Sequence, residues 1–129
     1  MKIADCVYVV ASGDAGFSLT HPIDCTVYLI DCGGELVLID AGCGLGTDLI
    51  LSEIQRDGFN PQNINAILLT HGHGDHIGGA KALAEVCDAK VYAMPPVVNF
   101  IQRGDLKALS ISPAIEMGMY PDDFSIARV

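Results

Sequence analysis

Short apolar runs separated by glycine, proline and polar residues divide the chain into predicted strands and helices. Residues 6–10, 26–30 and 35–39 alternate or run apolar and contain β-branched residues, which predicts strands. A turn with two glycines at 32–34 predicts that the last two of these strands pair as an antiparallel hairpin. Residues 64–69 form an apolar run that is too short for a helix and predicts a buried strand.

Other segments carry apolar residues at helical spacing. Thr47 is expected to cap a helix over residues 47–57, and Gly58 is expected to end it. Residues 80–86 combine good helix formers with a helical apolar period and predict a second helix. Residues 97–103 predict a short third helix, which ends at the glycine that follows.

The order of these elements predicts the fold class. Residues 90–94 predict a last strand, stopped by Pro95-Pro96, whereas residues 105–129 show no clear period and predict an irregular lid or spacer. The order of elements predicts an α/β (α+β) fold with one mixed/antiparallel β-sheet and helices on one face. A length of 129 residues fits a single domain over residues 1–129.

The loop at residues 70–79 concentrates side chains that bind metal ions. Within six positions it holds three of the four histidines and one aspartate, namely His71, His73, Asp75 and His76. Imidazole and carboxylate ligands suit zinc and neighbouring first-row metals. Because side chains alternate in an extended segment, we expect the first three to point one way, with His76 following as the chain turns. Gly72 and Gly74 are expected to allow the tight or left-handed backbone conformations that such a loop needs. The loop is expected to hold two metal ions.

The predicted elements on either side support a metal loop. A strand at 64–69 and a helix at 80–86 place the ligands between a strand's carboxyl end and a helix start, where open α/β folds put their sites. The alternative is a polar loop whose histidines only cap and solvate the chain. Four ligand-type residues so close together favour the metal loop.

The pattern His-x-His-x-Asp-His at residues 71–76, with Thr70 before it and Gly78-Gly79 after it, resembles the signature of the metallo-β-lactamase superfamily. Residues 27–30 and 36–42 look like the paired strands and Asp-x-Gly turn that family members carry upstream of the metal loop. The resemblance implies that this chain forms half of an αββα sandwich, with the metals at one edge of the sheets.

The resemblance also implies roles for single residues. His71 and His73 would bind a first metal ion, and Asp75 and His76 would bind a second. Asp75 would also serve catalysis by orienting the attacking hydroxide. Asp40 would support the loop through its carboxylate, as outer-shell partners of metal sites do; the alternative is a turn aspartate that bonds its own backbone. Zinc, as one or two ions, is the expected cofactor, and iron or manganese would suit the same ligands.

Two later histidines and a bridging acid of the family have no counterpart in this chain. No histidine follows His76, so the resemblance covers the amino-terminal half of the family's domain. Each ion would have two protein ligands, one fewer than a usual catalytic zinc. His21 is the remaining histidine, and it precedes Pro22 in a loop that the family places at the mouth of the site. It would contact substrate or metal there, or remain a solvated loop histidine.

The implied function is that of a metal-dependent hydrolase, in which a metal-bound hydroxide attacks a carbonyl or phosphoryl centre of a small-molecule substrate. The missing ligands would come from another chain that supplies the carboxyl-terminal half, or from association. The alternative is a truncated, non-catalytic αβ module that binds metal or a partner. Because an apolar sheet face left in water forfeits ~25 cal/mol per Å², we expect self-association through that face, as a C2 homodimer.

Composition narrows the range of partners. Sixteen acidic and seven basic residues give a net charge of −9, and no basic patch is visible to engage a nucleic-acid backbone. A phosphodiester substrate stays compatible because metal ions supply local positive charge. Mean hydropathy is +0.39, yet no apolar run approaches the ~20 residues of a membrane span. With no secretory signal visible, a cytoplasmic location is expected.

The five cysteines contain no Cys-x-x-Cys pair and are expected to be reduced, buried and apolar in character. Cys43 lies in the turn that follows Asp40 and is the one cysteine singled out as an adventitious metal ligand.

Overall fold

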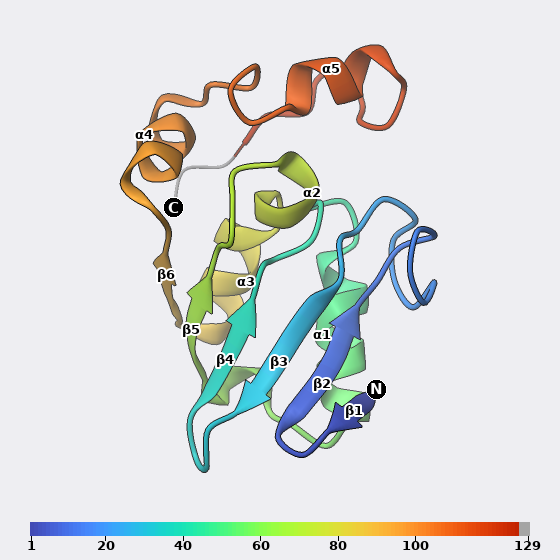
Figure 1. Ribbon diagram of the computed structural model, residues 1–129, viewed down its shortest axis with the longest axis vertical. Helices are drawn as coiled ribbons and strands as arrows, with labels where there is room; N and C mark the ends of the chain where they lie inside the picture. Colours follow the sequence, from blue (N-terminus) through green and yellow to red (C-terminus); the bar gives the residue numbers. More distant parts are fainter. Residues whose placement is uncertain (127–129) are drawn as a thin grey trace.

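A single six-stranded sheet runs through the computed structural model, which describes residues 1–126 (Figure 1). The strands follow chain order across the sheet: β1 (Lys2–Ala4), β2 (Val7–Ala11), β3 (Val27–Asp31), β4 (Leu36–Ile39), β5 (Ile64–Leu68) and β6 (Lys90–Tyr92). Neighbours are antiparallel from β1 to β4 and parallel from β4 to β6. The predicted mixed sheet is therefore confirmed.

The two faces of the sheet differ because apolar and less buried positions alternate along the central strands. Leu29, Leu38 and Ile67 stand in one cross-strand row and are fully buried. The neighbouring row contains Tyr28, Ile39, Leu68 and Tyr92, which are half-buried or exposed. The first row faces the core and the second faces away from it.

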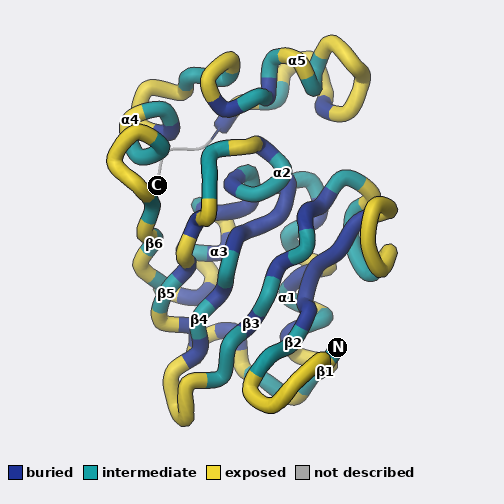
Figure 2. The backbone as a smooth tube through the Cα atoms, viewed as in Figure 1, coloured by how far each residue is buried: buried dark blue, intermediate teal, exposed yellow. Residues whose placement is uncertain are grey.

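Helices α1 (Thr47–Arg56) and α3 (Ala80–Cys87) cover the core face of the sheet, behind the strands in Figure 1. α1 packs on β2 and buries Ile50 and Ile54, while α3 packs on β5 and β6. No helix crosses the near face in this view, and the tube in Figure 2 shows buried positions interspersed with intermediate or exposed ones along β3 to β5. The expectation of helices on one face is confirmed for the described residues 1–126.

Two predicted helix starts need correction. Thr47 is the first helical residue of α1, and the cap position is Gly46, without a side-chain capping bond. Helix α4 (Pro95–Arg103) begins at the two prolines rather than after them, because proline's fixed φ and missing N–H suit the first turn. The predicted stops are confirmed: Gly58 and Gly104 have positive φ, which glycine adopts without a steric penalty.

The segment predicted to be irregular contains a helix. After α4, residues 111–116 form α5 (Ile111–Glu116), and Leu109, Ile111 and Tyr120 are buried nearby. The sequence lacked a period there because α5 is short and packs mainly through one residue, Ile111. The last three residues of the predicted lid, 127–129, lie outside the described residues. None of the helices among residues 1–126 has the length and apolar character needed to cross a bilayer.

Candidate metal centre

The loop that carries the ligand-type residues lies at the carboxyl ends of the parallel strands β4 and β5. It leaves β5, passes through the short helix α2 (Gly74–Ile77) and leads into α3, at the upper edge of the sheet in Figure 1. Asp40 follows β4 at the same edge, where its backbone N–H donates to Leu68 O at 2.9 Å. The predicted position between strand end and helix start is confirmed.

The backbone of the loop differs from the expected extended form. His73 is extended, but Asp75 and His76 stand on the first turn of α2. Gly72 and Gly74 do not have positive φ, so left-handed backbone is not their role. They make room instead: a Cβ on Gly74 would lie 2.6 Å from Ile111 Cγ1. The glycines let the loop pack closely under α5.

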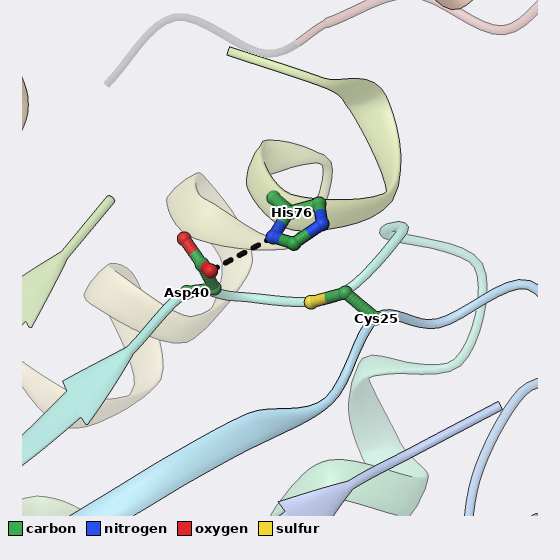
Figure 3. A group of neighbouring side chains, drawn as sticks. All are labelled: Cys25, Asp40 and His76. Atoms are coloured by element: carbon green, nitrogen blue, oxygen red, sulfur yellow. Dashed lines mark hydrogen bonds and ion pairs between the residues drawn. The ribbon is translucent and has the colours of Figure 1, made fainter. Parts of the chain in front are cut away.

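Asp40 joins both ends of the loop through its carboxylate. Its oxygens accept from the backbone N–H of Thr70 at 2.8 Å and from Thr70 Oγ1 at 2.7 Å. They also accept from His76 Nδ1 at 2.8 Å, the bond drawn in Figure 3. Burial acts to raise the pKa of the Asp40 carboxyl, but these hydrogen bonds outweigh it and hold that pKa below its usual value. Asp40 is thus a charged, buried anchor for the loop.

The same bonds define which nitrogen of two histidines remains free. Thr70 Oγ1 spends its hydrogen on Asp40, so it accepts from His71 Nδ1, 2.9 Å away. His76 likewise donates from Nδ1 to Asp40. In the neutral form of both rings, Nε2 is therefore an unprotonated lone-pair donor, as metal ligation requires.

The predicted ligands lie next to one another. The ring centroids of His71 and His73 are 4.7 Å apart, those of His71 and His76 are 4.0 Å apart, and His76 Nε2 is 3.5 Å from Asp75 Oδ2. Burial and the neighbouring histidines lower the pKa of His71, which keeps it neutral and able to bind a cation. Burial acts to lower the pKa of His76, but the bond to Asp40 and the charge of Asp75 raise it.

A third kind of ligand reaches this cluster, which sequence reasoning missed. Within residues 1–126, the donor atoms of Cys25, Asp40 and His76 all lie within 4.8 Å of one another (Figure 3). Only the antiparallel pairing of β3 and β4 brings Cys25 beside Asp40, so no local signal marked it. The donor set of imidazoles, carboxylates and a thiol, with Nε2 atoms free, fits a zinc-type ion.

The other residues considered in the sequence lie beside the site rather than in it. His21 Nδ1 is 3.6 Å from Cys43 Sγ, and His21 packs against Gly46, half-buried. Cys43 is fully buried, and burial raises its thiol pKa to about 12. The expectation of buried cysteines is right for Cys25, Cys43 and Cys87 but wrong for Cys6 and Cys32, which are exposed on turns around the strand ends.

An open cleft of about 560 Å³ lies beside the loop. Its lining combines polar groups of the site with apolar side chains, among them Asp75, His76, Ile23, Tyr28, Ile39 and Met119. A second cleft of about 230 Å³ lies between the loop and α5 and also touches Asp75 and Met119. No lysine or arginine of the described residues lines either cleft.

Comparison with known families agrees with this geometry. Residues 20–116, well over half of the chain, match the family model described as the metallo-β-lactamase superfamily. The chain belongs to the metallo-β-lactamase superfamily. The match spans the strands β3 to β6, the loop at residues 70–79 and α5, so the family assignment covers every residue of the candidate centre.

Curated relatives in this superfamily share part of the chain. A protein of Myxococcus xanthus described as a UPF0173 metal-dependent hydrolase is 56% identical over 69 residues, which are 54% of this chain and 23% of that protein. Ribonuclease J 1 of Streptococcus pyogenes is 33% identical over 86 residues, 62% of this chain and 15% of the relative. The chain thus spans less than a quarter of the length of these relatives.

Solved structures of the superfamily show the same fold. A B3 metallo-β-lactamase with an active-site glutamic acid superposes with a TM-score of 0.64 and 36% identity, over 77% of this chain and 34% of that one. A metallo-β-lactamase of Cronobacter sakazakii superposes with a TM-score of 0.70 and 25% identity, over 81% and 38%. The sheet and its helices therefore correspond to about a third of those chains.

Proposed function

We propose that this chain is the metal-binding part of a metal-dependent hydrolase, with zinc as its metal. His71 and His73 hold one ion, and Asp75 and His76 hold a second. The observation that carries the proposal is the fixed orientation of two rings. Thr70 and Asp40 occupy the Nδ1 atoms of His71 and His76 and leave both Nε2 atoms free. Iron or manganese would suit the same donor set.

Metal ions in such a site supply a Lewis acid and lower the pKa of a bound water to ~7. The chain's own residues prepare that chemistry. Asp40 keeps the proton of His76 on Nδ1, and its charge strengthens the ring as a donor. Asp75, whose side chain is 41% exposed, faces the cleft and orients the attacking water. The substrate enters the 560 Å³ cleft and presents a carbonyl or phosphoryl centre.

The complete centre needs ligands beyond those described here, since two protein donors for each ion are fewer than the three of a usual catalytic zinc. The family relatives are much longer than this chain. We propose that the remaining donors come from further polypeptide or from a second chain that packs on the open sheet face. Hydrolysis by the chain alone is therefore expected to be weak.

Native mass spectrometry tests the proposal, because it counts metal ions and subunits together. The zinc-loaded wild-type chain should carry one or two ions, and His73→Ala should lose at least one of them. His21→Ala is the matched control, because His21 lies against Cys43 outside the cleft. It should keep the wild-type count. Equal zinc content in His73→Ala and the wild type would overturn the ligand assignment.

A second candidate function is supported by the open sheet face. Leu68 and Tyr92 are 40% and 53% exposed in the same cross-strand row as Tyr28 and Ile39. Such a row is typical of an interaction surface, so the chain would serve as a self-associating module that binds metal without turnover. A metal-loaded dimer with no hydrolase activity would favour this function, whereas turnover that depends on His73 would favour the first.

A further inference from the structure

A buried thiol lies beside the Asp40–His76 pair. Cys25 lies two residues before the start of β3 and is 8% exposed. Its sulfur points toward Asp40 and His76 in Figure 3 and lies within 4.8 Å of a donor atom of each. The backbone holds it in place, because Cys25 N–H donates to Asp75 O at 3.4 Å. A thiol, a carboxylate and an imidazole from three separate segments thus meet at one point.

We propose that Cys25, Asp40 and His76 form a further metal site, which shares His76 with the loop site and takes a thiophilic divalent ion such as zinc, cadmium or cobalt. Thiolate, imidazole and carboxylate together favour such borderline ions over magnesium or calcium. Asp40 Oδ2 and His76 Nδ1 are 2.8 Å apart because they share a proton. Donor atoms around a tetrahedral zinc lie roughly 3.5 Å apart. Binding would therefore lengthen the distance between Asp40 Oδ2 and His76 Nδ1 slightly and bring the Cys25 sulfur closer to both.

The surroundings of Cys25 favour a cation. Burial raises the pKa of the Cys25 thiol, and the nearby carboxylates of Asp40, Asp75 and Asp24 raise it further. The same negative charges stabilise a divalent ion at this point. The backbone amide of Gly42 acts in the opposite direction and lowers the pKa of this thiol. An ion has a route in, because Cys25, Asp40 and His76 all line the open 560 Å³ cleft.

Occupation of this site competes with the loop site through His76. Binding releases the thiol proton of Cys25 to solvent. The ion takes Nδ1 of His76, so the proton of the neutral ring moves from Nδ1 to Nε2. A ring protonated on Nε2 has no lone pair for an ion beside Asp75. The cysteine site and the second loop ion therefore exclude each other, whereas His71 and His73 are not ligands of the cysteine site.

Cobalt absorption tests the site without any activity assay. The reduced chain with one equivalent of Co²⁺ should show a sulfur-to-cobalt charge-transfer band in the near ultraviolet. Cys25→Ser should lose the band. Cys87→Ser is the matched control, a buried thiol on α3 outside the cleft, and it should keep the band. A band that survives in Cys25→Ser, or a wild-type chain without one, would overturn the proposal.

Two further measurements keep the test decisive. His73→Ala removes a loop ligand but no ligand of the cysteine site, so it should keep the cobalt band. The two proposals can therefore fail separately. An unchanged zinc count in His73→Ala would contradict the loop assignment, whereas loss of the cobalt band in that variant would contradict the cysteine site. Circular dichroism shows whether Cys25→Ser folds. If it does not fold, X-ray absorption of the zinc-loaded Cys43→Ser chain takes the place of the cobalt experiment. A sulfur neighbour at about 2.3 Å from zinc is expected, and its absence contradicts the site.

Discussion

The two faces of the sheet have similar apolar side chains but different surroundings. On the helix-covered face, Leu29, Leu38 and Ile67 are fully buried under α1 and α3. On the open face, Leu68 and Tyr92 leave 40% and 53% of their surface exposed. The first face forms the core of this chain, and the second leaves apolar side chains exposed. The difference shows that burial depends on what packs against a strand face and not only on the strand's own apolar pattern.

The same contrast continues at the edge of the sheet where the metal loop lies. The Asp40 side chain is 5% exposed and accepts three hydrogen bonds, whereas Asp75 is 41% exposed and faces the cleft. One carboxylate holds the loop together, and the other is accessible from the cleft. Substitutions in matched pairs can separate these two roles.

The largest expected effect is in the core. Leu38→Ala should lower the free energy of unfolding by about 2–5 kcal/mol, because it removes buried contacts and leaves a cavity. Leu68→Ala is the matched change on the neighbouring strand, and in dilute solution it should stay within about 0.5 kcal/mol of the wild type. Urea unfolding measures both. Equal losses would mean that the open face is covered in solution.

The second effect separates the two carboxylates. Asp40→Asn should cost about 1.5–3 kcal/mol in the metal-free chain, because it weakens charge-assisted hydrogen bonds to Thr70 and His76. Asp75→Asn should leave the free energy of unfolding almost unchanged but lower zinc affinity. Thermal unfolding with and without zinc distinguishes them. An Asp75→Asn chain as destabilised as Asp40→Asn would contradict the division of roles.

The third effect concerns association rather than stability of the fold. Replacing Leu68 and Tyr92 by lysine places like charges on the open face, so any dimer should dissociate to monomer. Sedimentation velocity of the wild type and the double variant at matched concentrations measures this. Lys81→Glu, on the opposite side of the sheet in α3, is the control. A wild-type chain that stays monomeric at high concentration removes the self-association proposal.

The smallest effect is a pH dependence of the metal-free chain. The folded-state pKa of His76 is raised, chiefly because its bond to Asp40 and the charge of Asp75 outweigh burial. Its stabilisation is therefore complete below the unfolded value of ~6.5 and is lost as pH rises through the folded value. The folded-state pKa of Asp40 is lowered, so its stabilisation is complete above the unfolded value of ~3.9 and is lost as pH falls through the folded value. Urea midpoints of Asp40→Asn should vary less with pH across both ranges.

Local patterns predicted much of the fold and part of the site. Strands β2 to β6 and helices α1, α3 and α4 were visible because each repeats its apolar period over several residues. β1 is three exposed residues, and α5 buries chiefly Ile111, so neither carried a usable period. The ligand-type residues of the loop were visible because they are nearly consecutive in the sequence.

What the sequence by itself determined is the family, the sheet and the grouping of ligand-type residues at 70–79, since these depend on short-range order along the chain. The resemblance implied that Asp40 supports the loop, but only the tertiary structure decided which atoms it binds and which side chains lie behind it. Asp40 binds residues 30 and 36 positions away, and the hairpin of β3 and β4 brings Cys25 to the same sheet edge. Contacts of that kind follow from strand pairing and close packing, which no local pattern of side chains encodes.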